Sequence, residues 1–238
     1  MAAPIRKRVE KIMECKNETL KPYKLTGAIQ MYEATGEESY KDYAMAWLSR
    51  PAALGELSKE LSEDIPPQDA LAYFFALKQT GDVRYRKRMD DIFEQRSRIT
   101  ELMPFIAAYE TAYKRKEHYN EIAAFFRKKD RFTGKDLVSL IETVGQMSEE
   151  IYEYYRELRD LFKTAVKDRI KDLPDSGEAL EIGYSILKAC NIGVLQEEKY
   201  GHMAELVNKS MAEGMRAPQE GLWEMFKAQD IIRNKAQQ

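Results

Sequence analysis

The sequence contains little glycine, proline, cysteine or histidine. Among its 238 residues are 12 Gly, 8 Pro, 2 Cys and 2 His. Few turn-forming residues and no alternating apolar–polar run argue against a β-sheet protein. The two cysteines, Cys15 and Cys190, lie far apart and do not form the dense pattern of a disulfide-stabilised secreted domain. We therefore expect a reduced, helical, cytoplasmic protein.

An excess of either charge is also absent, as are long apolar runs. The chain has 38 Lys and Arg against 40 Asp and Glu, a net charge of -2. A general nucleic-acid-binding protein carries a basic excess, so that class is not expected. No apolar run reaches the roughly 18 residues of a membrane-spanning helix, and the N-terminus lacks the apolar segment of a secretory signal. The sequence thus predicts neither a nucleic-acid partner nor a membrane partner.

Signatures of common catalytic sites are missing as well. The sequence has no HExxH, no CxxC pair, no GxSxG and no GxxxxGK[ST]. We therefore expect no metal and no cofactor. A pair of carboxylates acting as acid and base remains the one visible enzymatic option. We expect the two histidines, His118 and His202, to be exposed and structural.

Apolar residues recur at helical spacing along the chain. In residues 134–147, for example, Leu137, Leu140, Ile141 and Val144 stand at i, i+3, i+4 and i+7. This spacing places them on one face of an α-helix. Because other segments show the same periodicity, the whole chain is predicted to be α-helical.

A pattern marked by tyrosine recurs five times. Residues 35–48 and 80–93 each begin with Thr-Gly-acidic, then a tyrosine and an amphipathic run, and three weaker copies follow. The marker residues are Tyr40, Tyr85, Tyr119, Tyr152 and Tyr200. Each follows a more apolar segment, so each repeat is interpreted as a helical hairpin. The apolar segments are 22–34, 68–79, 98–113, 134–146 and 177–194.

The two helices of each hairpin differ in polarity. The first is apolar around most of its circumference and must be buried, whereas the second has one apolar stripe and a charged face. Two further helices are predicted over roughly 4–16 and 218–235. An inner ring of apolar helices wrapped by an outer ring of amphipathic helices buries the apolar surface of both types. We therefore predict a single all-α domain over residues 1–238, an (α/α)6 toroid of about twelve helices. The alternative is an open superhelix of helix pairs, which the uneven repeat spacing disfavours.

The predicted site lies where the inner helices begin. In such a toroid these helices all run the same way, so their N-termini meet on one face. Helix N-termini present N–H groups without intrahelical partners and favour bound anions. The preceding loops contain Tyr23, Glu63, Asp64, Ser97, Arg98, Arg131, Thr133, Lys135 and Ser176. Simpler interpretations exist: Asp64 and Ser176 suit helix starts, and the arginines suit solvated charged faces.

Five segments carry short patterns of a known family, in the same order along the chain. ELMPFIAAYETAYKRKEHY (101–119) is similar to that family's Met-x-x-Pro-Phe helix, and DRFTGKDLVSLIETV (130–144) to its Trp-x-Arg-Gly-Asn-Gly-Trp segment. Residues 27–50, 63–85 and 176–200 resemble its first hairpin, its Asp-x-Ile-Asn-Pro segment and its Ser-Gly-Ser-Ala helix. The family is that of the unsaturated rhamnogalacturonyl and unsaturated glucuronyl hydrolases. The resemblance implies an (α/α)6 barrel.

The resemblance also implies a reaction. Members of the family use aspartate as general acid and base to hydrate the 4,5 double bond of a terminal unsaturated uronic acid. The main catalytic aspartate of the family falls at Ser97, with Glu94 and Glu101 one turn to either side. The second carboxylate falls at Glu63, with Asp64 adjacent, so these two are the predicted catalytic residues.

The residues predicted to bind substrate follow from the same resemblance. Arg131 and Gly134 match the Arg-Gly-Asn-Gly segment, while Thr133 and Lys135 replace its asparagine and tryptophan. Arg131 and Lys135 would hold the carboxylate of a small acidic oligosaccharide by charge-assisted hydrogen bonds. Three hypotheses stay open: a divergent hydrolase, a non-catalytic relative that binds an acidic sugar or a protein on the same face, and an unrelated helical-repeat interaction protein.

Overall fold

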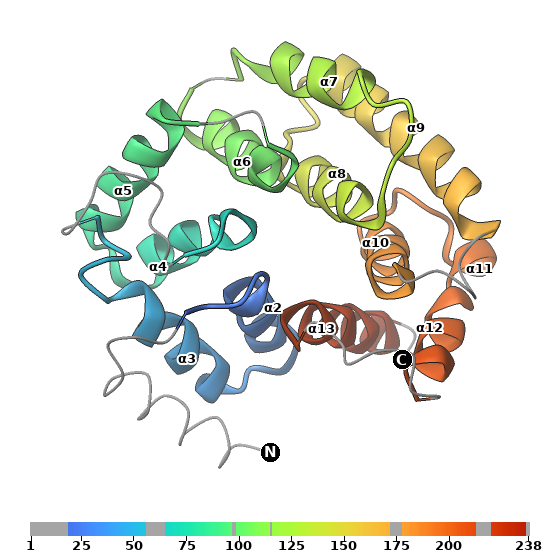
Figure 1. Cartoon of the computed structure of the whole chain (residues 1–238), viewed down its shortest axis with the longest axis horizontal. Helices are drawn as coiled ribbons and strands as arrows, with labels where there is room; N and C mark the ends of the chain where they lie inside the picture. Colours follow the sequence, from blue (N-terminus) through green and yellow to red (C-terminus); the bar gives the residue numbers. More distant parts are fainter. Residues whose placement is uncertain are drawn as a thin grey trace. The chain divides into compact units, whose positions relative to one another are not determined.

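The structure of the chain is a computed structural model. It describes residues 19–55, 65–96, 99–114, 116–171, 178–212 and 220–236. The regular structure of these residues is helical, with no strand among them, which confirms the all-α prediction (Figure 1). Among these residues, no helix has both the length and the apolar character to cross a membrane.

The helices follow one another as hairpins. The pairs are α2 (Lys24–Thr35) with α3 (Glu38–Leu48), α4 (Ala72–Thr80) with α5 (Val83–Glu94), α6 (Met103–Tyr113) with α7 (Tyr119–Arg127), and α8 (Gly134–Gln146) with α9 (Tyr152–Arg169). Next come α10 (Ala179–Asn191), α11 (Glu197–Tyr200), α12 (Met203–Ala212) and α13 (Glu220–Ala236). The short 3₁₀ helices η1 (Pro67–Asp69) and η2 (Thr100–Leu102) precede α4 and α6. The helix predicted over 4–16 lies outside the described residues.

The chain divides into two compact units. The first comprises Met1–Arg96 with Gln219–Ile231, and the second comprises Ser97–Pro218 with Ile232–Gln238. The helix α13 thus gives most of its length to the first unit. The toroid, which would include both units, stays a prediction.

The Thr-Gly turns of the predicted repeat have the same local structure. The Thr35 hydroxyl donates to the Met31 carbonyl and accepts the N–H two residues ahead, and Thr80 forms the equivalent pair of bonds. Gly36 and Gly81 follow with φ of 74° and 69°. Only glycine adopts this left-handed conformation without steric cost, so both helices end there. The first two repeats are therefore structural repeats.

In the second unit the first helices of the hairpins pack side by side in parallel. Ser139, midway along α8, donates to the Thr100 carbonyl just before α6, and Thr111 near the end of α6 donates to the carbonyl of Gln146, the last residue of α8, at 2.8 Å. The start of α8 at Gly134 meets the start of α10. The helices α7 and α9 form a second layer over α6 and α8 (Figure 1).

Burial differs between the two layers as the sequence predicts. The helix α6 buries every residue from Met103 to Glu110, whereas α7 buries one stripe at Tyr119, Ile122, Ala123 and Phe126. In the first unit α5 shows the same single stripe. The predicted difference between the two helix types is thus confirmed for the α6–α7 hairpin, whereas α4 in the first unit buries only Ala72, Tyr73, Phe75 and Ala76.

The last helix packs on α2 in the first unit. Lys24 Nζ lies 2.9 Å from Glu224 Oε1, and Gln229 Nε2 donates to Gln30 Oε1 at 3.0 Å. The contacts advance together along both helices, so α2 and α13 run parallel. Gly27 faces the Gly221 backbone so closely that a Cβ atom would overlap the Gly221 carbonyl oxygen.

Gly27→Ala should therefore destabilise the protein. The added methyl group meets backbone, which cannot rotate away, and such overpacking costs about 1–3 kcal/mol. Urea denaturation measures the change in the free energy of unfolding. Gly145→Ala in α8 is the matched control, because its Cβ would make only ordinary contacts, the nearest at 3.9 Å. That control should gain about 0.5–1 kcal/mol from helix propensity, and an equal loss in both variants would contradict the packing explanation.

Candidate functional site

The structure describes only some of the predicted site residues. Outside the described residues lie Glu63, Asp64, Ser97, Arg98 and Ser176. Tyr23 belongs to the first unit, and Arg131, Thr133 and Lys135 belong to the second. The two carboxylates near Ser97 in sequence are placed as well: Glu94 is the exposed last residue of α5, and Glu101 is half-buried in η2.

Tyr23 marks the start of α2. Its backbone is left-handed, with φ of 65°, and its carbonyl accepts the Gly27 N–H at 2.8 Å. The ring is buried in the first unit, and the Tyr23 backbone lies against Gly221 of α13. Tyr23 therefore helps to set the α2–α13 contact.

A buried carboxylate that the sequence reasoning missed caps the same helix. Asp69, in η1, is fully buried and accepts the Thr26 N–H at 2.8 Å through Oδ1, together with the N–H groups of Lys24 and Leu25. Its Oδ2 has no hydrogen-bond partner among the described residues. Burial raises the pKa of Asp69 to about 7, although these N–H groups oppose the rise. The sequence signal was its place just before an apolar helix, where acids are frequent.

Asp69 should make stability fall as pH rises. Its folded-state pKa lies above its ordinary value, so the folded protein holds the proton more tightly and the stabilisation is lost as pH climbs from about 4 through 7. In Asp69→Asn this slope should disappear between pH 5 and 8 in urea titrations. Asp69→Ala leaves buried N–H groups without an acceptor, so its free energy of unfolding should be lower than that of the wild type by about 1–3 kcal/mol at both pH 5 and pH 8. If the dependence of stability on pH is unchanged in Asp69→Asn, it arises from other titratable groups.

In the second unit, α8 begins with a capping box. The Thr133 hydroxyl accepts the Asp136 N–H at 3.2 Å, and Asp136 Oδ2 accepts the Thr133 N–H at 2.9 Å. Asp136 Oδ1 is held by Lys129 at 2.7 Å and by the Thr100 hydroxyl at 3.1 Å. Burial acts to raise the pKa of Asp136, but the hydrogen bonds from Lys129 and Thr133 outweigh it and lower the pKa. Asp136 is therefore an anion at neutral pH and has no proton to donate.

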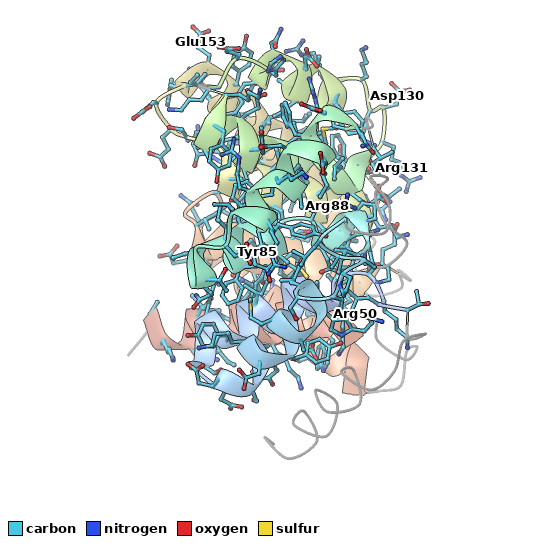
Figure 2. The ribbon with its side chains drawn as sticks, turned by 90° about the vertical axis from the view of Figure 1, so that its left-hand side faces the viewer. Arg50, Tyr85, Arg88, Asp130, Arg131 and Glu153 are labelled. Carbon is cyan, nitrogen blue, oxygen red and sulfur yellow. The ribbon has the colours of Figure 1, made fainter. Side chains whose placement is uncertain are left out.

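The predicted binding residues surround this cap. Arg131, Thr133 and Lys135 are exposed, within five residues of one another at the start of α8. Figure 2 shows Arg131 next to Asp130 in this segment. Lys129 balances the Asp136 charge, and the exposed charges in residues 130–136 are the cations Arg131 and Lys135 and the anion Asp130. Two exposed cations at a helix start suit a carboxylate or another anion.

Two glutamates at the start of α10, the N-cap residue Glu178 and Glu181, lie beside this cap and were not predicted. Glu178 pairs with Arg169 at the end of α9. Glu181 is buried, and its Cβ would lie 2.7 Å from a Cβ placed on Gly134. Burial raises the pKa of Glu181; its own backbone N–H lowers it, Glu178 raises it and Lys135 lowers it. An acidic residue inside an apolar segment was the available sequence signal.

The histidine prediction was wrong for one of the two residues. His202 is exposed, but His118 is half-buried at the α6–α7 turn, and its Nδ1 lies 2.6 Å from Oε1 of the fully buried Glu110. This pair sits at the C-terminal end of α6, away from the α8 cap, because α6 and α8 run parallel. Among the described residues there is no group of three or more His, Cys, Asp or Glu side chains placed to bind a metal ion.

Comparison of the chain with protein-family models, with curated proteins and with solved structures found no match. The family resemblance in the sequence therefore stays a prediction.

Thr133→Ala should weaken the start of α8. The variant removes the hydroxyl that accepts the Asp136 N–H, and loss of such a cap typically costs about 1 kcal/mol. Thr133→Ser keeps the hydroxyl and is the control; it should stay close to the wild type. The free energy of unfolding in urea distinguishes the two variants. Equal stability of Thr133→Ala and wild type would show that the cap contributes nothing.

Proposed function

We propose that the chain is a glycosyl hydrolase-like protein that binds the terminal uronate of an acidic oligosaccharide at the start of α8. The observation that carries the proposal is the pair of exposed cations, Arg131 and Lys135, beside a cap whose own carboxylate is already neutralised by Lys129. Arg131 offers a planar fork of N–H donors, which matches a carboxylate. Lys135 adds a point charge next to the first N–H groups of the helix.

The scaffold we propose is the single-domain (α/α)6 toroid. Within the second unit α6, α8 and α10 run parallel, and within the first unit α2 and α13 do so. A toroid extends this arrangement through the whole chain and gathers the helix starts on one face. The family resemblance supports the same arrangement.

The reaction we propose is hydration of a 4,5-unsaturated uronide. A proton adds to one carbon of the double bond and the hydroxyl of water to the other, and the product then rearranges with cleavage of the glycosidic bond. The reaction needs a carboxylic acid that still carries its proton. Asp136 does not fit this role, because its pKa is lowered. The resemblance assigns the role to Glu63 or Asp64.

A non-catalytic acidic-sugar-binding protein is the second candidate. It is favoured by Ser97, which stands where the family has its main catalytic aspartate. A serine hydroxyl does not protonate an alkene at neutral pH. The same α8 surface would then bind the sugar without converting it.

Lys135→Ala should weaken binding of an unsaturated galacturonyl or glucuronyl disaccharide. A hydrogen bond to a charged group contributes about 1.5–3 kcal/mol, so the dissociation constant should rise by roughly 10- to 100-fold. Isothermal titration calorimetry measures binding, and loss of the ultraviolet absorbance of the conjugated double bond measures turnover. Lys128→Ala, an exposed lysine after α7, is the matched control.

The two assays separate the candidate functions. Binding with loss of absorbance supports the hydrolase, and binding without it supports the sugar-binding protein. No binding of either disaccharide to the wild type would overturn both.

A further inference from the structure

The starts of α8 and α10 meet at a glycine. Gly134 is the first residue of α8, and a Cβ placed on it would lie 2.7 Å from the Glu181 Cβ and 2.9 Å from the Glu178 Cβ. Real Cβ atoms do not approach this closely, so a larger residue would push the two helix starts apart. Glycine thus brings the first turn of α10 against the cationic start of α8.

Glu181 is the carboxylate that this junction buries. It stands at the third position of α10, and 9% of the residue is exposed. Its carboxylate accepts its own backbone N–H, and no other described residue donates a hydrogen bond to it. A buried carboxylate with so few hydrogen bonds is costly when ionised. It is more stable in its protonated form or with a ligand that supplies the missing contacts.

The charges around Glu181 come from three helices. Lys135 approaches from α8, and Glu178 is the N-cap residue directly before α10; Arg169, at the end of α9, pairs with Glu178. Burial, the largest effect, and Glu178 raise the pKa of Glu181, and Lys135 opposes them. A carboxyl group whose pKa is raised holds its proton more tightly, which is the property that a general acid requires.

Other buried carboxylates of the second unit are already engaged. Asp136 accepts hydrogen bonds from Thr133, Thr100 and Lys129. Glu142 accepts from Tyr184, and Glu110 contacts His118 at the far end of α6. These contacts fix the position of each carboxylate in the fold. Glu181 differs because, among the described residues, only its own backbone N–H donates to it.

We infer that Glu181 is the proton donor of this site. The inference rests on the proposed function, with the uronate carboxylate bound by Arg131 and Lys135. Glu181 gives its proton to one carbon of the 4,5 double bond, and water adds to the other. The proton that the water loses returns to the Glu181 carboxylate, so the residue is regenerated and the net change is the addition of one water molecule.

Glu181→Gln tests this role. The amide keeps the shape of the side chain but has no acidic proton, so kcat for the unsaturated disaccharides should fall by roughly 10²- to 10⁴-fold. The dissociation constant of the same disaccharide should stay within about threefold of the wild-type value. Glu205→Gln makes the same change at an exposed position of α12 and should leave both quantities unchanged. Circular dichroism checks that each variant is folded.

A second variant and a pH profile separate proton donation from a structural role. Glu181→Asp keeps an acid and should recover part of the lost kcat. The wild-type kcat should fall on the alkaline side as Glu181 loses its proton, and this limb should be missing from the residual activity of Glu181→Gln. If Glu181 has only a structural role, its substitution should leave the alkaline limb of the kcat profile in place and at the same pH.

The outcomes distinguish this inference from the proposed function. If Glu181→Gln keeps the wild-type kcat, or if turnover is lost in Glu63→Gln or Asp64→Asn instead, Glu181 is not the proton donor. The proposal that the protein is a hydrolase is then unaffected. Binding of the disaccharides by wild type without turnover also overturns it and leaves an acidic-sugar-binding protein. Failure of the wild type to bind overturns the inference together with the proposed function.

Discussion

Close packing of parallel helix starts is the constraint on which the structure of each unit depends. In the first unit, Gly27 of α2 and Gly221 of α13 let two backbones approach where no Cβ atom fits. In the second unit, Gly134 has the same effect between α8 and α10. Each helix start carries N–H groups without intrahelical partners. Bringing such starts together in a low-dielectric setting therefore requires acceptors close by, and carboxylates supply them.

Three carboxylates near these starts have different properties because their surroundings differ. Asp69 accepts backbone N–H groups but is fully buried, and its pKa rises to about 7. Asp136 is also largely buried, yet Lys129 and Thr133 hold its charge and its pKa falls. Among the described residues, Glu181 has neither a comparable set of N–H donors nor an ion pair, and burial raises its pKa. The same chemical group is thus a helix cap with a raised pKa at Asp69, an anionic helix cap at Asp136 and a candidate acid at Glu181.

The chemistry proposed for the second unit follows from that division of roles. Asp136 fixes the start of α8 and leaves Arg131 and Lys135 exposed to an anion. Glu181, across the Gly134 contact, adds a carboxyl group that tends to keep its proton. The proposed hydration of an unsaturated uronate needs this combination, in which cations bind the anion beside a carboxyl group that can donate a proton.

The sequence by itself determined the local features: helical periodicity, the Thr35-Gly36 and Thr80-Gly81 turns, and the polarity of the two helix types. These depend on spacing and on backbone conformations within a few residues. The sequence also indicated that Arg131, Thr133 and Lys135 belong to one candidate binding segment. Only the tertiary structure brought in the buried acids and the His118–Glu110 pair, because burial and hydrogen-bond partners come from residues distant in the chain; Thr26 and Asp69 are 43 positions apart.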